Sequence, residues 1–270
     1  MNPDSAGRAL VTGASSGIGR EITRGLARRG YDLTLVGRRR DQLDALQSEL
    51  AACHGIRTCA QTLDLSEASH VDRLVADLER DPEPWSVLVN NAGFGVYGEF
   101  TTTDWDAEAR MIAVHIVAAT RLAKVICRSM RRTGSGRILN VASTSAFKPG
   151  PLGAVYAATK AYTLSLSEAL AEELRGSGIT VTALCPGYTL TEFMSRALSG
   201  GTEAPPRHAM APAAVAEIGL VAMFGGKRIV VPGVANQVHV LLVGLLPRSS
   251  VAWLTRRVRA GRHGGERNRR

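Results

Sequence analysis

The feature that most constrains the fold of this chain is a regular alternation of short apolar runs with amphipathic stretches. The runs are rich in Val, Leu and Ile, as expected of strands that are covered on both faces. The stretches between them carry apolar residues at the spacing of one helical face. This alternation predicts an α/β fold, a doubly wound parallel sheet with helices on both faces. The predicted strands are residues 8–12, 32–36, 58–63, 86–90, 137–142, 180–185 and 228–231.

Neither an internal repeat nor a linker divides residues 1–235, so we expect a single domain there. Its predicted helices cover residues 18–29, 43–50, 71–78, 104–131 and 154–174. Residues 199–212, rich in Gly and Pro, interrupt the pattern, and we interpret them as a lid over a ligand site. Residues 236–270 form a C-terminal extension that is apolar over 238–246 and then rich in arginine.

The composition narrows the class of protein. A hydrophobic fraction of 45% and a charged fraction of 21% are typical of a soluble globular domain, which argues against low-complexity disorder. Much of the net charge of +9 lies in the C-terminal arginines. We expect no nucleic-acid partner, whereas peripheral membrane contact through the extension stays open. The start of the chain lacks a signal-peptide pattern, and the cysteines form neither a C-x-x-C pair nor a metal site, so we predict a cytoplasmic protein without a bound metal.

A glycine turn links the first predicted strand to the first helix. Glycines there allow the backbone to approach a pyrophosphate, and the following helix offers free N–H groups and the positive end of its dipole. A purely structural turn is the alternative for a glycine pattern taken alone. Its place inside a βαβ unit favours dinucleotide binding. The residues expected to contact the dinucleotide are Gly13, Ser15, Ser16, Gly17, Ile18 and Gly19.

The end of the second strand predicts which dinucleotide is bound. The strand ends at Gly37 and is followed by Arg38. An acidic residue at this point would accept hydrogen bonds from the ribose of NAD, whereas an arginine can pair with the 2′-phosphate of NADP(H). A solvated basic loop is the alternative.

Tyr156 and Lys160 lie four residues apart and therefore on one helical face. A free tyrosine has a pKa of about 10, and a nearby ammonium group lowers that value toward the range of a useful acid or base. Ser143 ends the preceding strand, where its hydroxyl can bond a substrate oxygen. The three residues together predict proton transfer at a carbonyl or alcohol.

These motifs together resemble those of the short-chain dehydrogenase/reductase family over residues 7–233. The glycine turn, the Asn90–Gly93 segment, the serine, the Tyr-x-x-x-Lys pair and the Pro-Gly segment occur in the family's order. The resemblance implies a Rossmann-like fold and an NADP(H)-dependent oxidoreductase, with Ser143, Tyr156 and Lys160 as the catalytic residues. We expect a ketone reductase acting as a homodimer or homotetramer. Further cofactor contacts implied by the resemblance are Asp64, Leu65, Asn90, Ala92, Gly93, Tyr156, Lys160, Pro186, Gly187, Thr189 and Thr191.

His115 departs from the family pattern, because members often carry an asparagine there that holds a water for a proton relay. We predict that His115 takes over this catalytic role, with a structural histidine as the alternative. The motifs shared with this family leave other functions open. These are a non-catalytic NADP-binding sensor, a membrane-surface protein, and a dehydratase or epimerase on the same fold. Aromatic and apolar residues near the motifs are expected either to line a substrate pocket or to belong to the core: Phe94, Tyr97, Phe147, Tyr188, Phe193 and Met194.

Overall fold

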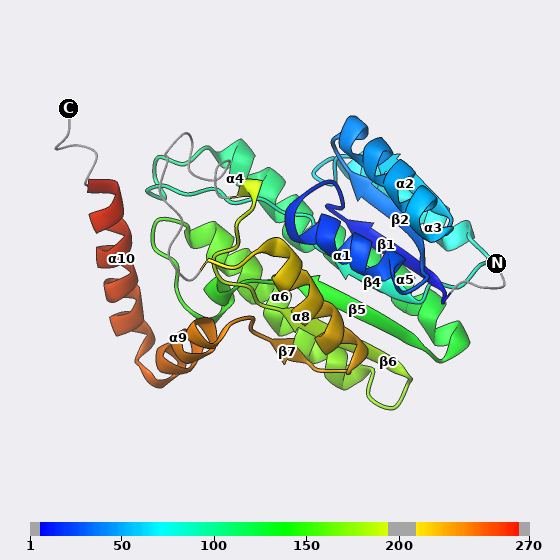
Figure 1. The fold of residues 1–270 in the computed structure, drawn as a ribbon. Helices are drawn as coiled ribbons and strands as arrows, with labels where there is room; N and C mark the ends of the chain where they lie inside the picture. The colour runs from blue at the N-terminus through cyan, green and yellow to red at the C-terminus, as the bar shows by residue number, and fades with distance from the viewer. Residues whose placement is uncertain (1–5, 194–208, 265–270) are drawn as a thin grey trace.

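The computed structural model of the chain describes residues 6–193 and 209–264, with side chains as far as residue 257. Within these residues seven parallel strands form one sheet in the order β3-β2-β1-β4-β5-β6-β7, and helices cover both sides (Figure 1). This architecture confirms the predicted single-domain, doubly wound, Rossmann-like sheet. The strands are β1 (Arg8–Thr12), β2 (Asp32–Gly37), β3 (Thr58–Thr62), β4 (Val87–Asn90), β5 (Gly136–Val141), β6 (Ile179–Leu184) and β7 (Ile229–Val230).

Two helical layers sandwich the sheet. One layer comprises α1 (Gly17–Ala27), α2 (Arg40–His54) and α8 (Pro212–Phe224). The other comprises α3 (Ala68–Arg80), α4 (Trp105–Ile112), the π-helical η1 (Ala113–Ala118), α5 (Ala119–Thr133) and α6 (Ala154–Glu173). The 3₁₀ helix η2 (Thr144–Phe147) follows β5, and the chain continues after β7 into α9 (Val234–Leu245) and α10 (Arg248–Gly264).

Two hydrophobic clusters fill the space between the sheet and these layers. Side chains alternate along a strand, so Ala9 and Val11 of β1 belong to the cluster beneath α1, whereas Leu10 belongs to the cluster on the other face. All three are fully buried. Strands that feed two cores need apolar residues at every position, which explains the unbroken apolar runs in the sequence.

Several elements differ from the sequence prediction. The helix predicted over residues 104–131 contains a π-helical segment, and α8 was not predicted at all. The sequence of α8 is apolar except for Glu217, so it has no clear helical period to detect. Strand β7 is shorter than predicted. Among the described strands, β3 pairs only with β2, and its residues are half-buried or exposed because it is an edge strand.

The order of the strands reverses between β1 and β4, whose carboxyl ends therefore flank a crevice where open α/β sheets bind ligands. The helices α9 and α10 lie toward this same end of the sheet (Figure 1). The predicted lid at residues 199–212 falls almost entirely outside the described residues. From its end, Met210 is held by backbone hydrogen bonds to Tyr188 and Leu190.

Candidate active site

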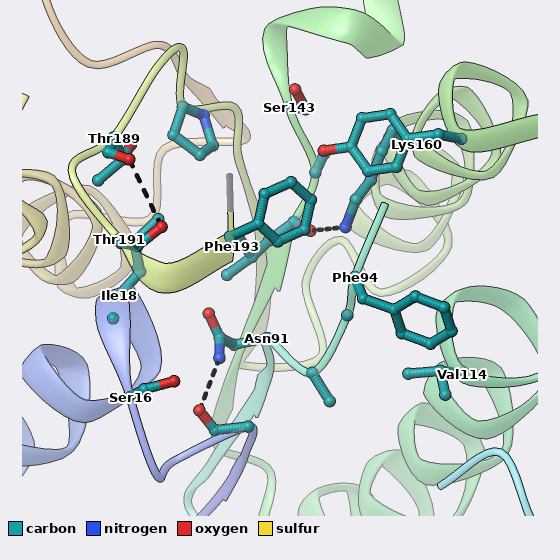
Figure 2. Close-up of a pocket in the computed structure, with 18 of the residues that line it drawn as sticks. Ser16, Ile18, Asn91, Phe94, Val114, Ser143, Lys160, Thr189, Thr191 and Phe193 are labelled. Carbon is teal, nitrogen blue, oxygen red and sulfur yellow. Dashed lines mark hydrogen bonds between the residues drawn. The ribbon is translucent and has the colours of Figure 1, made fainter. Parts of the chain in front are cut away.

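A cleft of about 330 Å³ opens at the carboxyl ends of the central strands. The glycine turn, the ends of β2, β4 and β5, helix α6 and the loop after β6 all contribute to its walls (Figure 2). Predicted cofactor residues that line the cleft are Gly13, Ser15, Ser16, Gly17, Ile18, Arg38, Asp64, Leu65, Ala92, Gly93, Tyr156, Lys160, Pro186, Gly187, Thr189 and Thr191. Gly19 is instead buried inside α1.

The glycine turn is shaped to receive a pyrophosphate. Gly13 has φ of 66°, a left-handed conformation, and a Cβ added there would lie 2.7 Å from Asn91 Nδ2. Only a residue without a side chain fits at this point. Helix α1 starts at Gly17, and the side chain of its N-cap residue, Ser16, makes no hydrogen bond to the N–H groups of the first turn. These N–H groups and the dipole of α1 suit a dinucleotide's phosphates, so the residues present fit the implied cofactor.

Asn91, rather than Asn90, lines the cleft. Its Nδ2 donates to the carbonyl oxygens of Thr12 (3.0 Å) and Gly13 (3.2 Å), which fixes the glycine turn against β4 (Figure 2). Asn90, which was expected to contact the cofactor, is buried behind the cleft and donates to Asn140 Oδ1 at 3.0 Å. Adjacent residues at the end of a strand face opposite sides, and the sequence alone does not say which side is the cleft.

Two arginines stand at the end of β2. Arg38 is more than half exposed, and its Nη1 lies 3.6 Å from Asp64 Oδ2. Burial raises the pKa of Asp64, but hydrogen bonds from Ser66 and the charge of Arg38 outweigh this and hold the pKa below its usual value. The sequence analysis missed Arg39, which also lines the cleft and donates to Ser15 Oγ at 3.3 Å. The sequence signal that could have identified Arg39 is its basic side chain directly after Arg38.

Three of the four predicted catalytic residues, Ser143, Tyr156 and Lys160, meet in the same cleft, whereas His115 is not among its lining residues. Ser143 is the N-cap of η2, and its Oγ accepts a hydrogen bond from the Ser145 N–H at 3.1 Å. Its own hydroxyl hydrogen is therefore available to another acceptor. Tyr156 and Lys160 are both 6% exposed and occupy successive turns of α6.

Lys160 is held in place from the sheet side. Its Nζ donates to the Val141 carbonyl oxygen at 3.0 Å and lies 5.9 Å from the centre of the Tyr156 ring (Figure 2). Burial lowers the pKa of Lys160 to about 8. Around neutral pH the residue therefore carries a positive charge inside the cleft, next to the tyrosine.

His115 connects two walls of the site. Its Nε2 accepts the Phe94 N–H at 3.2 Å, so Nδ1 carries the proton and donates to Thr159 Oγ1 at 2.8 Å. Thr159 in turn donates to the Tyr156 carbonyl oxygen at 2.8 Å. Burial, with a smaller contribution from the Lys160 charge, lowers the pKa of His115 well below 6.5. Both ring nitrogens of a neutral imidazole are thus engaged by protein atoms.

The His115 ring also constrains its surroundings. A Cβ at Gly93 would lie 2.5 Å from His115 Nε2, so a glycine is needed there. The ring belongs to η1, and π-helical segments occur frequently at functional sites. Behind it, a second cavity of about 20 Å³ is lined by residues that include Asn90, His115 and Lys160. A cavity of this size holds about one water molecule.

The loop after β6 closes the side of the cleft that faces α1. Thr189 Oγ1 donates to the Gly187 carbonyl oxygen at 3.2 Å, and Thr191 Oγ1 lies 3.4 Å from the Thr189 carbonyl oxygen (Figure 2). Side-chain atoms of Thr191 also approach Gly17 at the start of α1. The loop and the glycine turn therefore face each other across the predicted cofactor site.

Aromatic rings surround Tyr156. The ring centroid of Tyr97 lies 5.4 Å from that of Tyr156, and that of Phe193 lies at 5.9 Å. Of the residues proposed for a substrate pocket, Phe94, Tyr97, Tyr188 and Phe193 line the cleft. Phe147 packs against a small hydrophobic cluster instead, and Met194 lies outside the described residues.

The sequence analysis also missed Leu152, which lines the cleft. Its φ of 59° is the only positive φ of a non-glycine residue that the described part of the chain contains. Such a conformation is costly for a leucine and typical of functional sites. The residues around it, Pro151 and Gly153, were a turn signal, but they do not reveal which residue takes the strained conformation.

Among the described residues, no group of three or more His, Cys, Asp or Glu side chains could hold a metal ion. Over the same residues, none of the helices has the length and apolar character needed to cross a bilayer.

Comparison with known proteins decides the family. Residues 8–200 match the family described as short chain dehydrogenase. The chain belongs to the short-chain dehydrogenase/reductase family. Gluconate 5-dehydrogenase of Gluconobacter oxydans is 35% identical to this family member over 195 residues, which are 71% of this chain and 75% of that protein. A very-long-chain 3-oxoacyl-CoA reductase of Anas platyrhynchos is 30% identical over 231 residues, 84% of this chain and 73% of the relative.

A solved structure agrees with this assignment. A short-chain dehydrogenase from Sphingobium yanoikuyae, in complex with NADPH, superposes with a TM-score of 0.80 at 33% identity. The match covers 87% of this chain and 91% of that one. Membership in this family confirms the predicted enzyme class, an oxidoreductase that uses a nicotinamide cofactor.

Proposed function

We propose that this family member is an NADP(H)-dependent reductase of ketones or aldehydes. The observation that carries the proposal is the placement of Tyr156 and Lys160, buried on successive turns of α6 and lining one cleft with Ser143 and the glycine turn. A proton donor, a buried cation and a hydroxyl beside a dinucleotide site are what reduction of a carbonyl requires.

Each catalytic side chain has a separate task. When bound, NADPH supplies a hydride to the carbonyl carbon. The Ser143 hydroxyl, whose oxygen already accepts the Ser145 N–H, donates a hydrogen bond to the carbonyl oxygen. Tyr156 donates the proton that this oxygen needs, and the reverse transfer serves oxidation. The Lys160 ammonium stabilises the negative charge left on the tyrosine oxygen.

The preference for NADP(H) rests on the end of β2. Arg38 and Arg39 line the cleft directly after Gly37, and no acidic side chain occupies the strand end to accept ribose hydrogen bonds. Arginine binds phosphate through charge-assisted and often bidentate hydrogen bonds. The Sphingobium yanoikuyae structure in complex with NADPH supports the same preference.

We infer that the substrate is a carbonyl compound with an apolar group next to the reacting carbon. Tyr97 and Phe193 flank the Tyr156 ring, and Leu152 and Phe94 extend the apolar wall. Burial of a hydrocarbon group against such a wall contributes roughly 25 cal/mol per Å². The 3-oxoacyl-CoA reductase among the relatives agrees with a substrate of this kind.

We infer further that His115 positions catalytic elements and holds no relay water through its side chain. The chain of hydrogen bonds from Phe94 through His115 and Thr159 to the Tyr156 carbonyl oxygen uses both ring nitrogens. A relay water fits better in the 20 Å³ cavity beside Lys160. Asn90 Oδ1, which has no partner among the described residues, is an acceptor in the lining of that cavity.

Turnover with a panel of ketones tests the function. Oxidation of NADPH, followed at fixed protein concentration, should be fast with aryl or long-chain alkyl ketones and slow with small polar ketones. Lack of NADPH oxidation with every carbonyl compound would contradict the proposal. If substrates instead disappear without net consumption of cofactor, the enzyme is a dehydratase or an epimerase, the alternatives that the family motifs left open.

The oligomeric state of the protein stays a prediction. Exposed apolar residues on the outer sides of η1 and α6, Val117 and Tyr162, suit the predicted homodimer or homotetramer. The cytoplasmic location likewise stays a prediction. Sizing chromatography coupled to light scattering measures the oligomeric state directly.

A further inference from the structure

The helices α9 and α10 concentrate exposed apolar side chains on one part of the molecule. On α9 they follow the spacing i, i+4, i+7, i+8 and i+11, which puts them on one helical face, and their exposed fractions run from 49% to 75%. A contiguous apolar surface of this kind marks a binding site for another molecule. The residues of this C-terminal surface are Val234, Val238, Leu241, Leu242, Leu245, Leu246, Trp253 and Leu254.

Charge decides what kind of molecule the surface fits. Residues 233–264 contain no aspartate or glutamate. Within the described side chains, Arg256 and Arg257 are exposed on α10, and the Arg257 guanidinium lies 4.1 Å from the centre of the Trp253 ring. The other arginines of this segment are Arg248, Arg259 and Arg262. An aliphatic stripe next to a tryptophan and uncompensated arginines complements an apolar layer that lies beneath anionic headgroups.

The surface is fixed to the catalytic body next to the cleft. At the start of α9, Asn236 donates to the Pro232 carbonyl oxygen at 2.7 Å and packs against Gly187, a cleft residue. One turn further, His239 Nε2 lies 3.0 Å from Lys148 Nζ, directly after η2. Figure 1 shows α9 and α10 toward the carboxyl ends of the strands, and the residues that line the cleft lie at these same ends.

We propose that this C-terminal surface binds the anionic face of a lipid bilayer, with α9 and α10 lying in the interface. A second copy of the chain fits less well, because a two-fold interface sets like surfaces against each other and brings arginines together without acidic partners. A nucleic acid offers nothing to an aliphatic stripe. Docking in this orientation holds the cleft close to the bilayer, where apolar carbonyl compounds dissolve.

Flotation of the full-length protein with vesicles tests this proposal and requires no turnover, so its outcome is independent of the proposed reaction. Vesicles of phosphatidylcholine alone are compared with vesicles of phosphatidylcholine and phosphatidylglycerol, at low and high salt. The protein should float with the anionic vesicles and dissociate at high salt. Two double variants test the apolar and the basic part of the surface separately. One combines Leu241→Ser with Leu245→Ser, and the other combines Arg256→Gln with Arg257→Gln.

We expect the arginine variant to bind anionic vesicles roughly 20- to 30-fold more weakly. Each leucine should contribute roughly tenfold. Controls are Val221→Ser on α8 and Arg80→Gln on α3, which change exposed residues elsewhere on the molecule and should bind like wild type. Circular dichroism and melting temperature verify that every variant is folded.

Three results would overturn the proposal. One is equal binding to neutral and anionic vesicles. Another is unchanged flotation of both double variants. The third is wild-type protein that does not float with any vesicle. An oligomer that the leucine variant dissociates would then assign the surface to a second copy, and a monomer would point to another partner, such as an acidic protein.

Discussion

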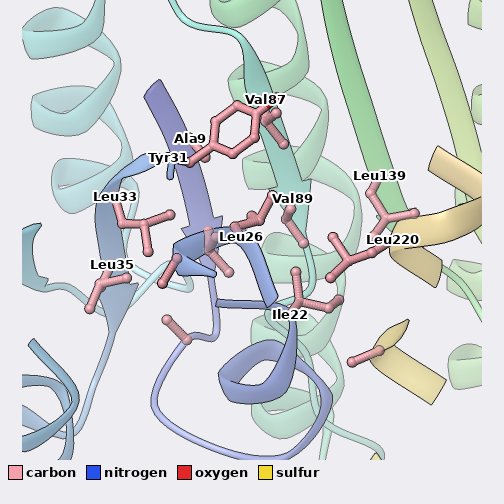
Figure 3. Packing of buried hydrophobic residues seen from close by; sticks show 14 of the residues in the cluster. Ala9, Ile22, Leu26, Tyr31, Leu33, Leu35, Val87, Val89, Leu139 and Leu220 are labelled. Atoms are coloured by element: carbon pink, nitrogen blue, oxygen red, sulfur yellow. The ribbon is translucent and has the colours of Figure 1, made fainter. Parts of the chain in front are cut away.

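Two leucines show how differently the catalytic body and the C-terminal helices use the same side chain. Leu26 on α1 is fully buried and packs with Ile22, Val89 and Leu220 beneath the sheet (Figure 3). Leu241 on α9 is 64% exposed. Both helices have one apolar face, but only α1 has a sheet to cover it. Amphipathicity therefore specifies a face that must be covered, and the rest of the molecule decides what covers it.

The basic residues differ between the two regions in the same way. In the body, Lys160 is buried, and the cost in free energy of burying its charge is expressed as a pKa lowered to about 8. In the C-terminal helices, Arg256 and Arg257 are exposed and carry their charge in water. We therefore expect substitutions in the body to change chemistry, stability or cofactor binding, and matched substitutions in α9 and α10 to change none of these.

The largest effect should come from Tyr156→Phe. The ring is retained, so the fold and cofactor binding should survive, whereas loss of the transferable proton should lower kcat at least ~10²-fold. Leu241→Ser with Leu245→Ser should leave kcat with a water-soluble ketone unchanged. Steady-state kinetics and NADPH titration of both proteins measure these outcomes. Substantial turnover by Tyr156→Phe would remove Tyr156 from the mechanism.

Matched truncations of the two leucines should separate the regions by stability. Leu26→Ala leaves a cavity in a closed core and should lower the free energy of unfolding by about 2–5 kcal/mol. Leu241→Ala removes exposed atoms and should change it by less than about 0.5 kcal/mol. Urea unfolding of wild type and both variants gives the two values. Equal losses would mean that another part of the protein covers α9 in solution.

Buried Lys160 should make stability depend on pH in a range where exposed lysines do not. Its pKa is about 8 in the folded protein and 10.5 in the unfolded chain, so the unfolded chain binds more protons between these values. Stability relative to Lys160→Met should therefore rise with pH from about 8 to 10.5, by roughly 3 kcal/mol in total. Thermal unfolding of cofactor-free protein across this range is the measurement. Parallel curves for the two proteins would show that Lys160 keeps an ordinary pKa.

Arginines at the cleft and on α10 should differ in cofactor binding. A charged hydrogen bond contributes roughly 1.5–3 kcal/mol, so Arg38→Ala should weaken NADPH binding about 10- to 100-fold and leave NADH binding almost unchanged. Arg256→Ala should affect neither cofactor. Fluorescence titration yields all four dissociation constants. Equal affinity of the wild type for NADH and NADPH would contradict the assigned preference.

The smallest effect is expected at His115, with exposed His239 as its control. An asparagine can replace one of the two hydrogen bonds of the imidazole, so His115→Asn should lower kcat by about tenfold or less, and His115→Ala by more. Because the His115 pKa is depressed, wild type should lose stability relative to His115→Asn as the pH falls below about 6.5.

The pH profile of kcat/KM separates positioning from proton relay. For a positioning residue, wild type and His115→Asn should have the same profile above pH 6, while His239→Asn should resemble wild type in every measurement. An ionisation near neutral pH that disappears in His115→Asn would restore the relay role predicted from the sequence.

Most of the architecture could be predicted from the sequence, because local patterns report it. Strands that feed two cores must be apolar throughout, as β1 is, and amphipathic helices such as α3 reveal their buried side through their period. Helix α8 was not predicted because, apart from Glu217, its residues are apolar and show no clear helical period. The order of motifs along the chain likewise identified Ser143, Tyr156 and Lys160, which the fold brings to one cleft.

What the sequence by itself determined is thus most of the elements of the sheet and its covering helices, and the chemistry available to them. Only the tertiary structure decided that Asn91 rather than Asn90 faces the cleft, that Phe147 packs away from it, and that His115 bonds Phe94 and Thr159. It also decided that the apolar face of α9 points to solvent. The physical reason is that a side chain's neighbours depend on how distant segments pack, and no local period or spacing along one segment contains that information.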